Sequence, residues 1–143
     1  MILPDVNVLV YAHRADSADH AEYREWLEAT INAEAAYGLS DLVLSGFMRV
    51  VTHPRVFETP STLASATRFV AQLREQPNRV GITPGPHHWE IFARLCDAAG
   101  AKGNLVADAH LAAMSIENGC EWITTDRDFS RFPGLKWRHP LRP

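Results

Sequence analysis

The first fourteen residues, MILPDVNVLVYAHR, place an acid inside one of the most apolar stretches of the chain. An ionised carboxylate that is left unpaired in apolar surroundings shifts its pKa or destabilises the fold. Asp5 therefore lies exposed at the end of a strand, forms local hydrogen bonds, or is neutralised by a cation. Pro4 fits a strand end better than a central strand position. We expect a strand over residues 1–3 and a helix directly after Asp5, although periodicity alone also allows one longer strand.

The rest of the chain alternates short strands with longer helices. We predict helices over residues 18–35, 42–52, 61–76, 87–99 and 104–118, and strands over residues 36–39, 80–83, 120–124 and 136–139. This alternation predicts an α/β three-layer sandwich, in which a mainly parallel sheet of short strands is flanked by helices. A length of 143 residues is typical of one domain, so residues 1–143 are expected to form a single domain.

Several side chains have expected places on these helices. Ser40 or Asp41 is expected to cap helix 42–52, and Ser61 to cap helix 61–76. Gly119 is expected to end helix 104–118 in a left-handed conformation. Two helices are expected to turn apolar sides inward, one with Leu63, Ala66, Phe69, Val70 and Leu73, the other with Trp89, Phe92, Ala93 and Cys96.

Composition argues against several classes of protein. The net charge of −3 supplies no overall positive field for non-specific polyanion binding, unless a local patch or a bound metal provides one. Cys96 and Cys120 lack metal-ligand spacing, which predicts two reduced core thiols in a cytoplasmic protein. The chain has no apolar run long enough to span a membrane, and its N-terminus lacks the basic region of a signal peptide. A cytoplasmic protein without membrane association is expected.

Three acids are predicted to meet at one edge of the sheet. Open parallel sheets bind ligands beyond the carboxyl ends of their strands, where the strand order reverses. Asp5 and Asp126 follow predicted strands, and Asp108 lies near the start of an otherwise apolar helix. Three carboxylates in one crevice repel one another unless a proton or a divalent metal compensates. Oxygen ligands without Cys or paired His favour Mg²⁺ or Mn²⁺ over zinc.

Each acid also has an ordinary structural interpretation. Asp5 could be a strand-end cap, Asp108 could be an acid favoured by the dipole of its helix, and Asp126 and Asp128 could be turn residues. The combination favours a metal site more than any one of them does. His87, His88 and His110 are spaced wrongly for a shared site and are interpreted as cap, surface or hydrogen-bonded side chains.

Three segments resemble the motif blocks of the PIN-domain ribonucleases, and most closely those of the VapC toxins of bacterial toxin–antitoxin pairs. They are PDVNVLVYAHR from Pro4, LVADAHLAAM from Leu105 and TTDRDFSRFPGL from Thr124. A further segment, LVLSGFMRVVTHPRVF from Leu42, resembles a block of one VapC subgroup. The resemblance spans essentially the whole chain, in order and with similar spacing, and it implies a PIN-like fold.

The resemblance implies a metal-dependent endoribonuclease that cleaves structured RNA, tRNA or ribosomal RNA, through a metal-activated water. It carries the binding of Mg²⁺ or Mn²⁺ and the catalytic role to Asp5, Asp108 and Asp126. Asn7, Thr125 and Asp128 match positions that support the site. Arg49 and Arg55, with His53 between them, could contact RNA phosphates or could complement the C-terminal end of a helix.

The resemblance also implies partners. These are an RNA substrate, a second copy of the chain in a homodimer, and a VapB-type antitoxin that covers the groove leading to the acids. The apolar side chains of one predicted helix exceed what one face buries, so they either receive such a partner or belong to the core: Leu42, Phe47, Val50 and Val51.

One position departs from the family. Gly46 lies where many PIN domains place a glutamate, and Asp41 is five residues away, so the number of metal ions, one or two, stays open. A non-catalytic PIN-like binding module is therefore an alternative. An aspartate-nucleophile phosphohydrolase is a weaker one, because that class places an acid where this chain has Asn7.

Overall fold

The computed structural model describes all 143 residues and contains a five-stranded sheet in which all paired strands run parallel. The strands are β1 (Ile2–Pro4), β2 (Tyr37–Leu39), β3 (Arg79–Gly81), β4 (Glu121–Ile123) and β5 (Trp137–Arg138). The helices are α1 (Val6–His13), α2 (His20–Asn32), α3 (Asp41–Val51), α4 (Leu63–Arg74), α5 (His88–Ala99), α6 (Asn104–Glu117) and the 3₁₀ turn η1 (Arg127–Arg131). The predicted α/β class with short strands is confirmed.

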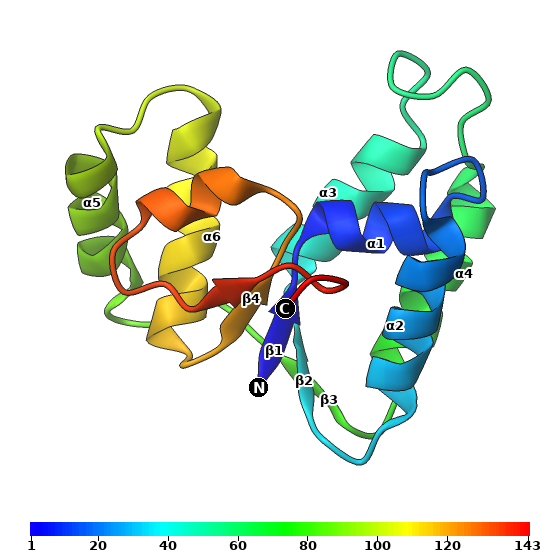
Figure 1. Cartoon of the computed structure of the whole chain (residues 1–143), viewed down its shortest axis with the longest axis horizontal. Coiled ribbons are helices and arrows are strands. Elements are labelled where there is room, and N and C mark those ends of the chain that lie inside the picture. The colour runs from blue at the N-terminus through cyan, green and yellow to red at the C-terminus, as the bar shows by residue number, and fades with distance from the viewer.

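The chain starts at the centre of the sheet and leaves it in two directions. The strand order is β3-β2-β1-β4-β5, so the first excursion builds one half of the sheet and the second builds the other. Right-handed crossovers place the helices of the two excursions on opposite faces. Figure 1 shows the result, with α1 to α4 on one side of the strands and α5 and α6 on the other. Strand order therefore reverses between β1 and β4, where a ligand crevice is expected.

The central strands are largely apolar because both of their faces are buried in the core. Because helices cover both faces of a parallel sheet, its central strands are buried on both sides. Leu3, Trp122 and Ile123, from β1 and β4, are fully buried. Alanines on α6 are buried as well, and their small side chains let that helix lie close to the sheet: Ala109, Ala112 and Ala113.

Several helix ends agree with the sequence and one does not. Ser40 caps α3 by accepting the N–H of Leu42 at 3.2 Å, and Gly119 has the expected left-handed φ of 64°. The prediction for α4 was wrong by one residue, because the Thr62 hydroxyl, not that of Ser61, accepts the N–H of Ser65, at 3.1 Å.

The predicted inward faces of α4 and α5 were partly wrong. Leu63 and Trp89 are 66% and 70% exposed. Helix α5 buries His88 and Leu95, two turns apart on one stripe, and this rotation leaves Ala93 exposed and Phe92 and Cys96 half-buried.

Two of the histidines whose spacing argued against a shared site are neighbours in the fold. The rings of His88 on α5 and His110 on α6 have centroids 4.3 Å apart, because the two helices pack against each other. His88 Nε2 lies 2.9 Å from the backbone carbonyl oxygen of His110, so the buried ring has a hydrogen-bond partner, as the sequence interpretation required. No helix of this fold combines the length and the apolar character needed to cross a bilayer.

Candidate active site

The structure brings the three predicted acids to one pocket. Asp5 directly follows β1, Asp126 follows β4, and Asp108 lies in the second turn of α6. All three line a pocket of about 480 Å³ at the carboxyl edge of the sheet. Most of the other lining residues are apolar: Val6, Val10, Tyr11, Val50, Val56, Phe57, Ala107, Leu111 and Phe129. The pocket thus combines acidic groups with a largely apolar wall.

Asp5 is held by hydrogen bonds from both neighbouring segments. It is the N-cap of α1, and its Oδ1 accepts the N–H of Val6 at 2.7 Å. Its Oδ2 accepts the hydroxyl of Thr124 at 2.7 Å and, at 3.3 Å, the side-chain amide of Asn7. The residue is 6% exposed. Of the alternatives that the sequence left open for Asp5, exposure is wrong and local hydrogen bonding is confirmed. The same residue also lines the acidic pocket.

Thr124 is the residue that sequence reasoning missed. Besides donating to Asp5, its Oγ1 accepts the side-chain amide of Asn7 at 3.2 Å and the N–H of Asp126 at 3.1 Å. One hydroxyl thus uses its donor and both acceptor positions, and it ties two of the acids together. Thr125, which the family resemblance singled out, contributes its backbone N–H to Asn7 Oδ1 at 3.3 Å.

Burial and mutual repulsion change the acidity of two of these carboxyls. Burial raises the pKa of Asp5 to about 6, against the lowering by its hydrogen bonds from Thr124 and Val6, and the charges of Asp108 and Asp126 raise it further. Burial also raises the pKa of Asp108 to about 6, helped by the charges of Asp126 and Asp128. Ionising the cluster is thus costly without a compensating cation.

Asp126 and Asp128 also act as turn residues. Asp126 caps η1 by accepting the N–H of Asp128 on its Oδ1 at 2.9 Å. Asp126 lines the acidic pocket, whereas Asp128 is exposed and does not line it. Asp128 influences the site through its charge, which helps to raise the pKa of Asp108.

The structure separates the two predicted arginines. Arg49, on α3, lines the acidic pocket and is its one cationic residue. Arg55 is exposed in the following loop, outside this lining, and its N–H donates to His53 Nδ1 at 3.0 Å. Arg49 is thus placed to face an anion in the pocket, and Arg55 is not.

Neither Gly46 nor Asp41 brings a further acid to the site. Asp41 forms an exposed ion pair with Arg74 at 2.6 Å. Gly46 faces α1 closely, because a Cβ built on it lies 3.1 Å from Cγ2 of Val6. The acids of the pocket are therefore Asp5, Asp108 and Asp126.

The donor set fits a hard divalent cation in its chemistry. Three carboxylates on one pocket, without Cys or paired His, are the oxygen ligands that Mg²⁺ and Mn²⁺ prefer. In the side-chain arrangement of this structure, no three His, Cys, Asp or Glu groups converge closely enough to hold a metal ion. Binding would therefore have to draw the carboxylates together against the repulsion that helps to raise the pKa values of Asp5 and Asp108.

Replacing Thr124 tests its role as a positioning residue. Thr124→Val should weaken Mn²⁺ binding about 10- to 100-fold, because groups that orient metal ligands have effects of this size. The loss follows because Asp5 Oδ2 keeps only the 3.3 Å hydrogen bond from Asn7 and the Asp126 N–H loses its acceptor. Isothermal titration calorimetry measures the affinity, and Thr124→Ser, which keeps the hydroxyl, should bind nearly as wild type. Equal affinities of the Val and Ser variants would contradict this role.

Sequence comparison identifies relatives along nearly the whole chain. The PIN domain family model matches residues 2–135. Ribonuclease VapC43 of Mycobacterium tuberculosis is 49% identical over 141 residues, which cover 99% of this chain and 96% of that protein. Ribonuclease VapC25 of the same organism is 39% identical over 140 residues, with 98% and 99% covered.

Solved structures share the fold at low sequence identity. VapBC2 from Rickettsia felis, bound to a DNA fragment from its promoter, matches with a TM-score of 0.70 and 18% identity, covering 97% of this chain and 98% of that one. VapC20 of Mycobacterium tuberculosis, described as a toxin that cleaves the sarcin–ricin loop, matches with a TM-score of 0.64 and 17% identity, covering 95% and 99%. With its carboxyl-edge acids and these relatives, the chain belongs to the PIN-domain family, in its VapC group.

Proposed function

We propose that this chain is the toxin of a type II toxin–antitoxin pair and cleaves structured RNA, tRNA or ribosomal RNA, as a metal-dependent endoribonuclease. The observation that carries the proposal is the meeting of Asp5, Asp108 and Asp126 on one pocket at the reversal of strand order, in a chain 49% identical to a VapC ribonuclease. The activity is assigned to a single domain, residues 1–143, and to the cytoplasm, where such RNA substrates are found.

Asp5, Asp108 and Asp126 would hold Mg²⁺ or Mn²⁺. Such an ion, when bound, lowers the pKa of a water and offsets the charge that develops on phosphate. The chain itself positions the carboxylates: Thr124 and the Val6 N–H hold Asp5, while Asn7 links the Asp5 side to the turn after β4. Arg49 adds a positive charge on the same pocket, where it can attract an RNA phosphate.

The apolar wall of the pocket supports a VapB-type antitoxin as partner. Val56 is 54% exposed, and both Val56 and Val50 line the pocket. Leu42 is 49% exposed but lies outside this lining. A partner segment with apolar side chains would cover this wall and block access to the acids. Phe47 and Val51 are fully buried and belong to the core, so they are removed from the predicted docking surface. A homodimer is proposed from the family.

The loop that carries Val56 and Phe57 is held by contacts with Arg14 at the C-terminal end of α1. The Arg14 guanidinium lies 4.0 Å from the ring centroid of Phe57, in the range of a cation–π contact. Arg14 also donates to the Ser61 hydroxyl at 3.2 Å and pairs with Asp16 at 2.6 Å. These contacts hold Val56 and Phe57 beside the acids, where a partner or substrate would meet them.

The purified chain should cleave bacterial tRNA or ribosomal RNA in Mg²⁺ or Mn²⁺ and lose that activity in excess EDTA. Cleavage mapping identifies the site, and calorimetric titration with Mn²⁺ should show saturable binding. Expression should arrest growth, and co-expression of a small antitoxin from the neighbouring reading frame should relieve the arrest. A chain that neither cleaves RNA nor binds Mn²⁺ saturably would instead be the non-catalytic binding module, an alternative favoured by the separation of the carboxylates in this structure.

A further inference from the structure

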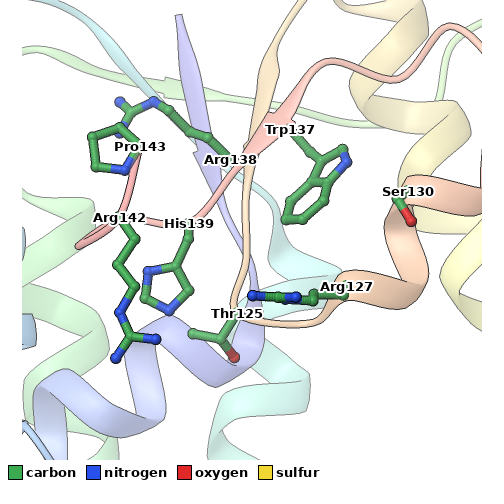
Figure 2. Close-up of a pocket in the computed structure, with 8 residues that line it drawn as sticks. All are labelled: Thr125, Arg127, Ser130, Trp137, Arg138, His139, Arg142 and Pro143. Atoms are coloured by element: carbon green, nitrogen blue, oxygen red, sulfur yellow. The ribbon is translucent and has the colours of Figure 1, made fainter.

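We infer that a basic pocket beside the acidic one binds the RNA strand next to the cut, with a phosphate on two arginines and a base on a tryptophan. This inference rests on the proposed ribonuclease function. The pocket has a volume of about 510 Å³ and lies between the turn after β4 and the C-terminal segment (Figure 2). Its lining includes Thr125, Arg127, Trp137, Arg138, His139 and Arg142.

The two pockets share one turn of the chain. Thr125 and Arg127 line the basic pocket, and Asp126 between them lines the acidic one. The turn is fixed by its backbone, since the Thr125 N–H donates to Asn7 Oδ1 and the Asp126 N–H to Thr124 Oγ1. A nucleic acid strand with a phosphate at Asp126 therefore has its neighbouring nucleotide beside the basic pocket.

The basic pocket holds positive charge that no carboxylate neutralises. Arg138 pairs with Glu121 at 2.6 Å, but Arg127 and Arg142 form no ion pair and are exposed. Both charges also act on His139. Burial lowers the pKa of His139, and the positive charges of Arg142 and Arg127 lower it further. In a chain of net charge −3, this local patch attracts anions such as phosphate.

The C-terminal segment is held so that Arg142 faces this pocket. His139 Nδ1 accepts the N–H of Leu141 at 3.1 Å, and its Nε2 lies 3.4 Å from the hydroxyl of Tyr23 on α2. His139 thus links the end of the chain to the helical layer. Figure 2 shows the Arg142 side chain beside the His139 ring.

Trp137 makes a nucleic acid a better ligand than an acidic peptide. The residue lies on the edge strand β5, and its half-buried indole borders the same pocket as Arg127. Single-stranded RNA is recognised by stacking of bases on aromatic and guanidinium planes combined with contacts to phosphate. An acidic peptide would use the two arginines but would leave the indole face without a matching group.

A pair of double variants tests the inference. Arg127→Ala with Arg142→Ala should raise the KM for tRNA or ribosomal RNA about 10-fold or more and change kcat little, because phosphate contacts hold substrate without taking part in cleavage. The control, Arg68→Ala with Arg94→Ala, removes equal charge from exposed positions on α4 and α5 and should leave KM unchanged. Trp137→Leu should weaken binding about 5- to 100-fold, as loss of one stacked base does, and Trp137→Phe should recover part of it.

Direct binding separates this inference from the proposed function. Fluorescence anisotropy with single-stranded oligouridylate in EDTA measures binding without cleavage. The slope of log affinity against log salt should decrease in magnitude by about 1 to 1.5 in the double variant. If the wild-type protein binds the RNA but never cleaves RNA, the proposed function is wrong, whereas the RNA-binding role of the basic pocket is supported. The inference is wrong if the double variant matches its control in KM and binding, or if only antitoxin affinity falls. Arg142→Ala alone, near the chain end, gives the same test should the double variant unfold.

Discussion

Asp5→Asn and Asp108→Asn should each lower RNA cleavage by the purified chain roughly 100-fold or more and relieve growth arrest on expression. Removing one charged group from a site that stabilises developing charge has effects of this order. Each substitution removes one negative charge from the pocket and one oxygen that can bind a hard cation. The side chain keeps its size, so the packing of the pocket is preserved.

The controls distinguish lost chemistry from lost structure. In the Asp5→Asn variant, the amide oxygen can still accept the Val6 N–H, which Asp5 accepts at 2.7 Å, so the cap of α1 should survive. Asp97→Asn removes an equal charge from an exposed position on α5 and should cleave as wild type does. Circular dichroism should show the same helix content in all three variants. Full toxicity of both pocket variants, at normal expression, would end the proposal that these acids perform the reaction.

The metal-free protein should lose stability as pH rises from about 4 to about 6, through the titration of Asp5 and Asp108. Folding raises the pKa of Asp5 from 3.8 to about 6, so in this window the folded chain holds a proton that the unfolded chain has released. Stability then falls with rising pH. For the buried Asp5 the loss approaches its full size of about 1–3 kcal/mol by pH 7. Asp108 is more exposed and should contribute less.

Two comparisons measure this effect. In EDTA at neutral pH, Asp5→Asn should be more stable to urea than wild type, and the difference should shrink as the pH approaches about 4. Saturating Mn²⁺ should stabilise wild type more than the variant, because a ligand that binds only the folded state adds stability. A stability difference between wild type and Asp5→Asn that stays constant from pH 4 to 7 without metal would contradict the raised pKa of Asp5.

The sequence was sufficient for the fold class and for the meeting of the acids. Asp5 and Asp126 each follow a short apolar run, and the ends of parallel strands share one edge. Asp108 was recognisable because its helix is otherwise apolar. These inferences depend on patterns within one segment and on a general rule of parallel sheets, so they need no knowledge of side-chain packing.

What the sequence could not predict depends on packing between segments. Thr124 and Thr125 are chemically alike and adjacent, and only the way β4 lies beside β1 decides which hydroxyl reaches Asp5. The exposure of Trp89 follows from the rotation of α5 set by His88 and Leu95. Arg127 and Arg142, from distant parts of the chain, line one basic pocket, an arrangement that no periodicity encodes.

The close approach at Gly46 has an evolutionary consequence. A Cβ there would lie 3.1 Å from Cγ2 of Val6, and a valine in a helix has almost no alternative rotamer to give way. Val6 also supplies the N–H that Asp5 accepts. A lineage that gained an acid at position 46 would therefore disturb the acid at position 5 unless position 6 became smaller. The side chains at positions 46 and 6 are thus coupled, and an acid at position 46 is accommodated best together with a smaller side chain at position 6.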